Sequence, residues 1–118
     1  MNPDNLPHAI YSITNKISGK RYIGMTRSPE TREYNHFMGL RRGYHHNPRL
    51  QEAFTEFGEA SFQWEILETV SDKSSALQRE RFWIRHFDSF HNGYNGSDGL
   101  ESRTKFLKLK YETTKGER

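Results

Sequence analysis

Two short β-rich segments joined by a polar turn occupy residues 10–25 and most strongly constrain how this chain can fold. Tyr11 lies in the first segment, Tyr22 in the second, and Gly19 in the turn, where glycine readily takes positive φ. Side chains along a strand alternate between the two faces of a sheet. If Tyr11 pairs with Gly24, both tyrosine rings share one face, and Gly24 leaves room beside the Tyr11 ring. A slip of one residue sends the two rings to opposite faces.

The remaining local signals predict one α/β (α+β) domain, which suits a chain of 118 residues. A capping residue followed by proline marks two helix starts, at residues 28–29 and 47–48, and a glycine ends each helix. Residues 62–67 alternate as a third strand, and a third helix should run from about residue 72 to 87. We therefore expect a small three-stranded antiparallel sheet flanked by three or more helices.

Charged side chains are unevenly distributed along the chain. Residues 1–50 hold 8 Lys or Arg against 3 Asp or Glu, residues 51–100 hold 4 against 9, and residues 101–118 hold 6 against 3. This asymmetry favours a polyanionic partner on the first half and on the tail, although an ordinary mixed surface explains it equally well. The absence of cysteine excludes disulfides and thiolate metal sites and fits a reducing compartment. No apolar run approaches the roughly 20 residues that span a membrane.

Glu80 interrupts the apolar stripe of the third predicted helix. It lies three residues after Leu77 and four before Ile84, so its carboxylate falls on the face that should meet the core. A core-facing carboxylate is costly unless it is paired or binds a metal. Two interpretations stay open: a buried salt bridge to Arg32 or Arg85, or a ligand for a divalent ion, since hard cations prefer carboxylate oxygen.

Five other positions have both a functional and an ordinary interpretation. Arg32 and His36 are four residues apart and share one helix face. This pair either belongs to a functional site or forms an ordinary solvated basic surface. Asn95 is a turn former or a hydrogen-bonding site residue. His45 and its neighbour His46 resemble a metal pair, but adjacent side chains diverge on regular structure and no third ligand is spaced to join them. We therefore expect no histidine metal site.

Five motifs lie in order along the chain: Ala9-Ile10-Tyr11, Tyr22-Ile23-Gly24, Arg32 with His36, Glu80 with Trp83, and Gly93-Tyr94-Asn95. Together they resemble the motif set of the GIY-YIG nuclease superfamily, most closely the nuclease domains of phage-type homing endonucleases. The resemblance spans residues 8–98, with a loose arm at 1–7 and a basic tail at 99–118 that forms a linker or short helix. Ala9 replaces the first glycine of the family motif, which affects only local packing.

The resemblance implies an endonuclease that hydrolyses a DNA phosphodiester with one divalent ion, Mg²⁺ or Mn²⁺, per active site. Glu80 would be the metal ligand, and Arg32 would neutralise the phosphate, a task that suits its planar multi-donor head. The alternative is a non-catalytic or structure-specific nucleic-acid-binding module on the same fold. The setting implied is the cytoplasm of a bacterial or phage-infected cell, with no membrane and no small-molecule cofactor.

The family's other site residues map onto Tyr11, Tyr22, His36 and Asn95. Tyr11 would be the general base or orient the attacking water, with Tyr22 beside it; His36 would orient groups or shuttle a proton, and Asn95 would hold the site through hydrogen bonds. A free tyrosine has a pKa near 10, so nearby positive charge must favour the phenolate. The resemblance therefore implies a cleavage rate that rises with pH above neutrality.

Basic side chains near the proposed site could contact the DNA backbone phosphates, and such contacts position DNA without reading its sequence. A missing C-terminal DNA-reading domain or a transient dimer on DNA would supply specificity and cutting of both strands. The candidates for backbone phosphate contacts are Arg21, Arg27, Arg41, Arg42 and His45.

Overall fold

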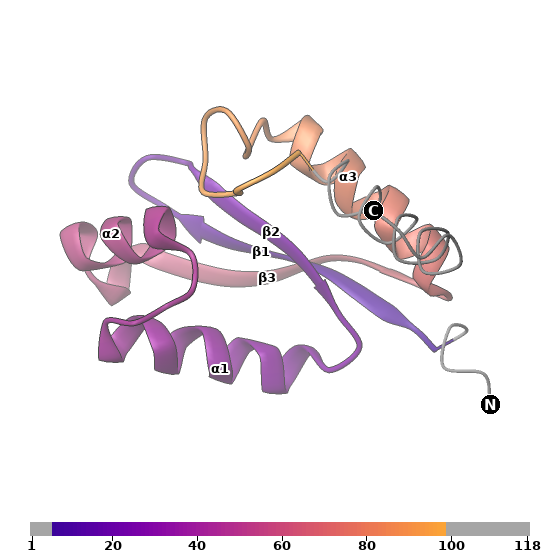
Figure 1. Ribbon diagram of the computed structural model, residues 1–118, viewed down its shortest axis with the longest axis horizontal. Helices are drawn as coiled ribbons and strands as arrows, with labels where there is room; N and C mark the ends of the chain where they lie inside the picture. Colours follow the sequence, from indigo (N-terminus) through magenta and orange to yellow (C-terminus); the bar gives the residue numbers. More distant parts are fainter. Residues whose placement is uncertain (1–5, 99–118) are drawn as a thin grey trace, which may run out of the picture.

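The computed structural model describes residues 6–98, and the predicted tail at 99–118 and most of the predicted arm lie outside this range. A three-stranded antiparallel sheet has the order β2-β1-β3. Strand β1 (His8–Asn15) is central, between β2 (Arg21–Thr26) and β3 (Phe62–Val70) (Figure 1). The prediction of the sheet is confirmed, although β3 extends three residues beyond the predicted end at Leu67.

The hairpin register is the one that places the two tyrosines together. Tyr11 pairs with Gly24, and Ile13 pairs with Tyr22. Both tyrosine side chains therefore lie on the same face of the sheet, as predicted. The turn between the strands contains Gly19 at a φ of 80°, a conformation that favours glycine.

Three helices flank the sheet: α1 (Pro29–Arg42), α2 (Pro48–Phe57) and α3 (Lys73–His86), with a 3₁₀ turn at Glu59–Ser61 before β3. Two of the three predicted caps form a side-chain hydrogen bond, whereas Ser28 precedes Pro29 at the start of α1 without one. The Asn47 side chain accepts a hydrogen bond from the Leu50 N–H, and Asp72 accepts one from the Ser75 N–H. Within residues 6–98, no helix is long and apolar enough to cross a membrane.

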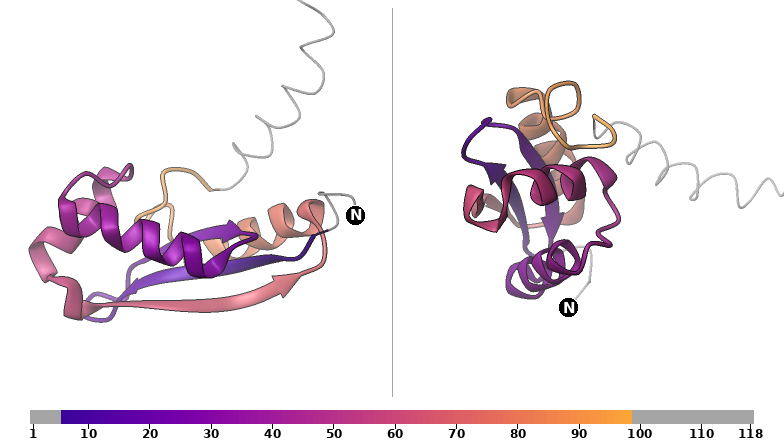
Figure 2. Two further views of the ribbon diagram at one scale, coloured as in Figure 1. Left: turned by 90° about the horizontal axis from the view of Figure 1, so that it is seen from below. Right: turned by 90° about the vertical axis from the view of Figure 1, so that its left-hand side faces the viewer.

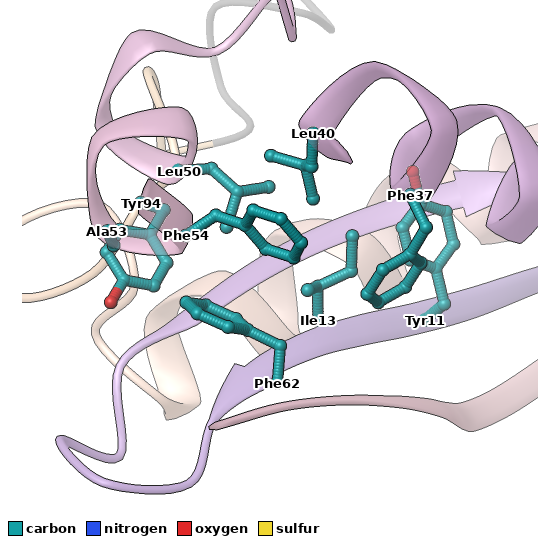
Figure 3. Close-up of a cluster of buried hydrophobic side chains, with 9 residues drawn as sticks. All are labelled: Tyr11, Ile13, Phe37, Leu40, Leu50, Ala53, Phe54, Phe62 and Tyr94. Carbon is teal, nitrogen blue, oxygen red and sulfur yellow. The ribbon is translucent and has the colours of Figure 1, made fainter. Parts of the chain in front are cut away.

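The sheet has a separate apolar cluster on each face. Helices α1 and α3 lie on opposite sides of the strands in Figure 1, and Figure 2 shows the loop after α3 beside α2. Ile10, Ile23, Ala76 and Ile84 form the cluster under α3. The larger cluster under α1 and α2 consists of Tyr11, Ile13, Phe37, Leu40, Leu50, Ala53, Phe54, Phe62 and Tyr94 (Figure 3). One of the two site tyrosines is thus part of the core.

Candidate active site

Tyr11 is fixed from several directions. Its side chain is only 1% exposed, and its ring stacks on Trp64 with the centroids 4.4 Å apart and the planes 20° from parallel. Its hydroxyl forms a hydrogen bond of 2.7 Å with Nε2 of His36 in α1. Gly24 lies directly beneath the ring, where a Cβ atom would overlap the hydroxyl. The phenol therefore has one position.

Tyr22 is half-buried and faces a different environment. It lines a pocket of about 390 Å³ together with Glu80, His46 and Asn95. Burial raises the pKa of both tyrosines, and the charge of the Glu80 carboxylate raises them further. The positive charge of Arg32 lowers the pKa of each phenol. A phenolate at this site therefore depends on nearby cations.

Three imidazoles gather beside the tyrosines. Nδ1 of His36 lies 2.6 Å from Nε2 of His45, and the ring of His45 stacks on that of His46 with centroids 4.3 Å apart. The expectation that His45 and His46 diverge is wrong, because both lie between α1 and α2, outside regular structure. In the part of the chain that the structure describes, no three His, Asp or Glu side chains form a metal-holding group.

The histidines make acid stability a test of this arrangement. Burial, together with the charges of His45, His46 and Arg32, lowers the pKa of His36 to about 3, so the folded protein keeps this imidazole neutral. Below pH 6.5 the unfolded chain binds a proton at His36 that the folded chain does not, so the free energy of unfolding decreases as the pH is lowered. Between pH 6.5 and 5 this loss is about 2 kcal/mol. Urea unfolding of His36→Gln should show a correspondingly smaller loss; equal losses in both proteins would contradict a neutral buried His36.

Helix α3 lies on the face of the sheet opposite the tyrosines. From this helix, Glu80 reaches the pocket at the outer edge of β2 that Tyr22 also lines. Burial raises the pKa of its carboxyl to about 7. Among residues 6–98, no ion pair with Glu80 is formed, so the salt bridge to Arg32 or Arg85 is not observed. The carboxylate lines a pocket with polar side chains and open space. A half-buried, unpaired carboxylate of this kind fits a hard cation that keeps several waters.

Asn95 completes the outer edge of β2. Its Oδ1 accepts the Ile23 N–H at 2.8 Å, and its Nδ2 donates to the Ile23 carbonyl at 2.9 Å, as a neighbouring strand would do. The Ser89 hydroxyl donates to the same Oδ1 at 2.7 Å. These bonds fix the backbone between Tyr22 and Gly24, so the Asn95 amide positions both residues.

Replacing Asn95 should destabilise the fold. Asn95→Ala leaves the buried N–H and C=O of Ile23 without their partners, at an expected cost of about 2–4 kcal/mol. The measurement is the urea midpoint, with Asn92→Ala as a matched control at an exposed position of the same loop. Similar midpoints for the two variants would show that the Asn95 amide does not hold the edge of β2.

Two residues without a predicted role support the site. Trp64 of β3 stacks on Tyr11. Arg49 in the first turn of α2 donates hydrogen bonds to three carbonyls of the loop that carries Asn95, those of Phe90, Gly93 and Asn95. Strand alternation places Trp64 on the Tyr11 face, but its partner depends on long-range pairing. No local pattern signals the Arg49 contacts.

The predicted basic residues separate into two groups. Arg32 lines an open pocket of about 390 Å³ with His36, His45 and His46, and His46 also lines the Glu80 pocket. Arg21 lies on the α3 face, where its guanidinium donates to Glu65 at 2.9 Å and stacks over Phe87.

Arg41 is also engaged away from the tyrosines, since its guanidinium donates to both carboxylate oxygens of Glu59. Arg27 and Arg42 are exposed, and Arg42 donates to the Tyr44 hydroxyl at 3.2 Å. The positions of Arg21 and Arg41 therefore do not favour them as phosphate contacts beside the tyrosines.

The model of the GIY-YIG catalytic domain matches residues 7–95 of this chain. The chain belongs to the GIY-YIG family. Intron-associated endonuclease 1 of Enterobacteria phage T4 is 34% identical over 115 residues, which cover 90% of this chain. The same alignment covers 46% of that protein, so this chain spans less than half the length of its curated relative.

Solved GIY-YIG structures share the fold described above. The catalytic domain of homing endonuclease I-TevI has a TM-score of 0.72 and 35% identity over 76% of this chain and 98% of that one. A mutant form of the catalytic domain of intron endonuclease I-TevI has a TM-score of 0.71 and 34% identity, over 78% and 95%. The predicted GIY-YIG fold is thus confirmed.

Proposed function

We propose that this chain is a DNA endonuclease that hydrolyses phosphodiester bonds with one divalent ion, Mg²⁺ or Mn²⁺. The observation that carries the proposal is the Glu80 carboxylate, which opens into a pocket beside Tyr22 without an ion pair in the described part of the chain. The likeness to an intron-associated endonuclease and to the I-TevI catalytic domain supports it.

Glu80 would hold the ion, with water and substrate oxygens as its other ligands. When bound, a divalent ion supplies positive charge that stabilises the negative charge developing on the phosphate. Arg32, exposed on α1 and lining the neighbouring pocket, would bind a non-bridging phosphate oxygen. His46 lies between the two pockets, so one DNA strand would cross this ring on its way from Arg32 to Glu80.

Burial favours Tyr22 over Tyr11 as the phenol that meets the attacking water. Tyr22 lines the Glu80 pocket, whereas the Tyr11 hydroxyl is buried and bonded to His36. This assignment revises the expectation that Tyr11 is the base. Tyr22 would orient the water and accept its proton, and Tyr11 would support the Tyr22 ring from 6.5 Å away.

The raised pKa of Tyr22 predicts a cleavage rate that increases with pH above neutrality, because the phenolate fraction grows. Single-turnover rates from pH 6.5 to 9 measure this dependence. Tyr22→Phe should lose both the rate and its pH dependence. A steep pH profile retained by Tyr22→Phe and lost by Tyr11→Phe would return the role to Tyr11.

The proposed activity is tested with supercoiled plasmid, Mg²⁺ or Mn²⁺, and an EDTA control. Nicked or linear product that requires the ion supports the endonuclease. DNA binding in a gel-shift experiment without any cleavage supports the alternative, a non-catalytic or structure-specific binding module. The DNA partner, the one-ion stoichiometry and a cytoplasmic setting in a bacterial or phage-infected cell are parts of the same proposal.

One small site acts on one strand per visit, so double-strand cutting would require a second molecule or a rebinding step. The greater length of the phage relative supports a DNA-reading domain after this one in the complete protein. Analytical ultracentrifugation with and without a DNA duplex distinguishes a second molecule from a rebinding step. A dimer that forms only on DNA indicates a second molecule, and a monomer on DNA indicates rebinding.

A further inference from the structure

We infer that the backbone N–H of Asn47 sets the direction of a hydrogen-bond chain through His45 and His36 to Tyr11, and that His45 is a positioning residue for the Tyr11 hydroxyl. The activity part of this inference rests on the proposed nuclease function. The hydrogen-bond part does not.

The chain begins at a group that can only donate. The Asn47 N–H lies 3.0 Å from Nδ1 of His45, so this nitrogen must be an acceptor without a proton. Asn47 is itself immobilised. Its side-chain oxygen caps α2 at Leu50, and its amide nitrogen donates to the Tyr94 carbonyl at 2.7 Å.

Each following contact then has one possible donor. Neutral His45 carries its proton on Nε2, which lies 2.6 Å from Nδ1 of His36. His36 therefore accepts at Nδ1 and carries its own proton on Nε2, 2.7 Å from the Tyr11 oxygen. The lowered pKa values of both histidines, about 3 for His36 and about 4 for His45, agree with neutral rings.

Tyr11 is consequently an acceptor toward His36. Its own O–H must point elsewhere, and a proton from Tyr11 cannot enter His36, because Nε2 is already protonated. His36 thus acts as a donor that favours negative charge on the Tyr11 oxygen rather than as a base that removes its proton. The chain of donors starts at the backbone N–H of Asn47. Among substitutions at position 47, only proline therefore removes the first donor.

The direct test is NMR of the ¹⁵N-labelled full chain at pH 7.5. We expect a scalar coupling between Nε2 of His45 and Nδ1 of His36, with the shared proton on His45 and the single ring proton of His36 on Nε2. His46→Gln, which removes the stacked neighbour without touching the chain of bonds, should keep the coupling. A proton on Nδ1 of either His36 or His45 overturns the inference.

A functional test compares two substitutions at His45. Glutamine can place an amide N–H near the position of Nε2, whereas leucine removes the donor. His45→Leu should lower the cleavage rate on saturating DNA by about 10–100-fold with little change in DNA affinity, and His45→Gln should restore most of the rate. Loss of affinity at an unchanged rate would mean that His45 binds phosphate instead and would overturn its positioning role, as would a glutamine variant no better than leucine.

The two tests separate the two proposals. If the wild type cleaves no DNA, the proposed function fails, and the NMR coupling alone decides the hydrogen-bond chain. If His45→Leu does not fold, as judged by circular dichroism, the glutamine variant and the wild-type coupling decide it.

Discussion

Glu80→Gln should lose DNA cleavage by about 10²–10³-fold while the protein becomes more stable at pH 8. The two effects have one cause. Burial raises the pKa of the Glu80 carboxyl to about 7, so ionising it at pH 8 costs folding free energy that a neutral amide does not incur. The sign follows from linkage: between about pH 4.5 and 7 the folded state binds the extra proton, so stability decreases as pH rises through this window. The gain on substitution should be up to about 3 kcal/mol.

This result distinguishes a site carboxylate from a structural one. Breaking a buried salt bridge would instead destabilise the protein by roughly 3–5 kcal/mol. Chemical denaturation at pH 8 and plasmid cleavage with Mg²⁺ are the two measurements. Glu65→Gln is a matched control, because Glu65 pairs with Arg21 on the sheet face opposite the tyrosines and its loss should spare cleavage. Normal cleavage by Glu80→Gln would refute the metal assignment.

Gly24→Ala should have the second large effect. A Cβ at this position would lie 2.5 Å from the Tyr11 ring carbon that bears the hydroxyl and closer still to the hydroxyl itself. The ring cannot retreat, since it stacks on Trp64 and is bonded to His36. We expect a stability loss of about 1–3 kcal/mol from overpacking. Cleavage should fall by about 10²-fold, because small displacements at an active site are costly.

A double-mutant cycle isolates the cause. In a Tyr11→Ala background the space beside Gly24 is free, so adding Gly24→Ala should cost little further stability. Urea unfolding of the four proteins measures the coupling between the two positions. Equal costs of Gly24→Ala in both backgrounds would show that the β2 backbone, and not contact with Tyr11, requires glycine.

The hairpin and the helix ends could be predicted from the sequence because their determinants are local. Alternation fixes which side chains share a face, and the Tyr11–Gly24 register follows from keeping both tyrosines together. Asn47 caps α2 through its side chain, as its position before proline indicates. The Glu80 anomaly was equally local, since a carboxylate in an apolar stripe needs an explanation wherever the helix packs.

The features that escaped prediction depend on distant contacts or on irregular backbone. His45 and His46 stack because they lie in the short connection between α1 and α2, where regular spacing rules do not apply. Arg49 binds carbonyls more than forty residues away. Arg21 is different: it neighbours Tyr22 on a strand, so alternation already placed it on the opposite face.

The edge strand β2 has an evolutionary consequence. The Asn95 amide occupies its outer hydrogen-bonding positions at Ile23, while β1 holds its inner side. An insertion or deletion of one residue inside either strand would move Tyr11, Tyr22 or Gly24 to the wrong face, and no helix movement could compensate. Changes in length should therefore accumulate among relatives in the 16–20 turn, and the spacing from each tyrosine to its strand partner should stay fixed.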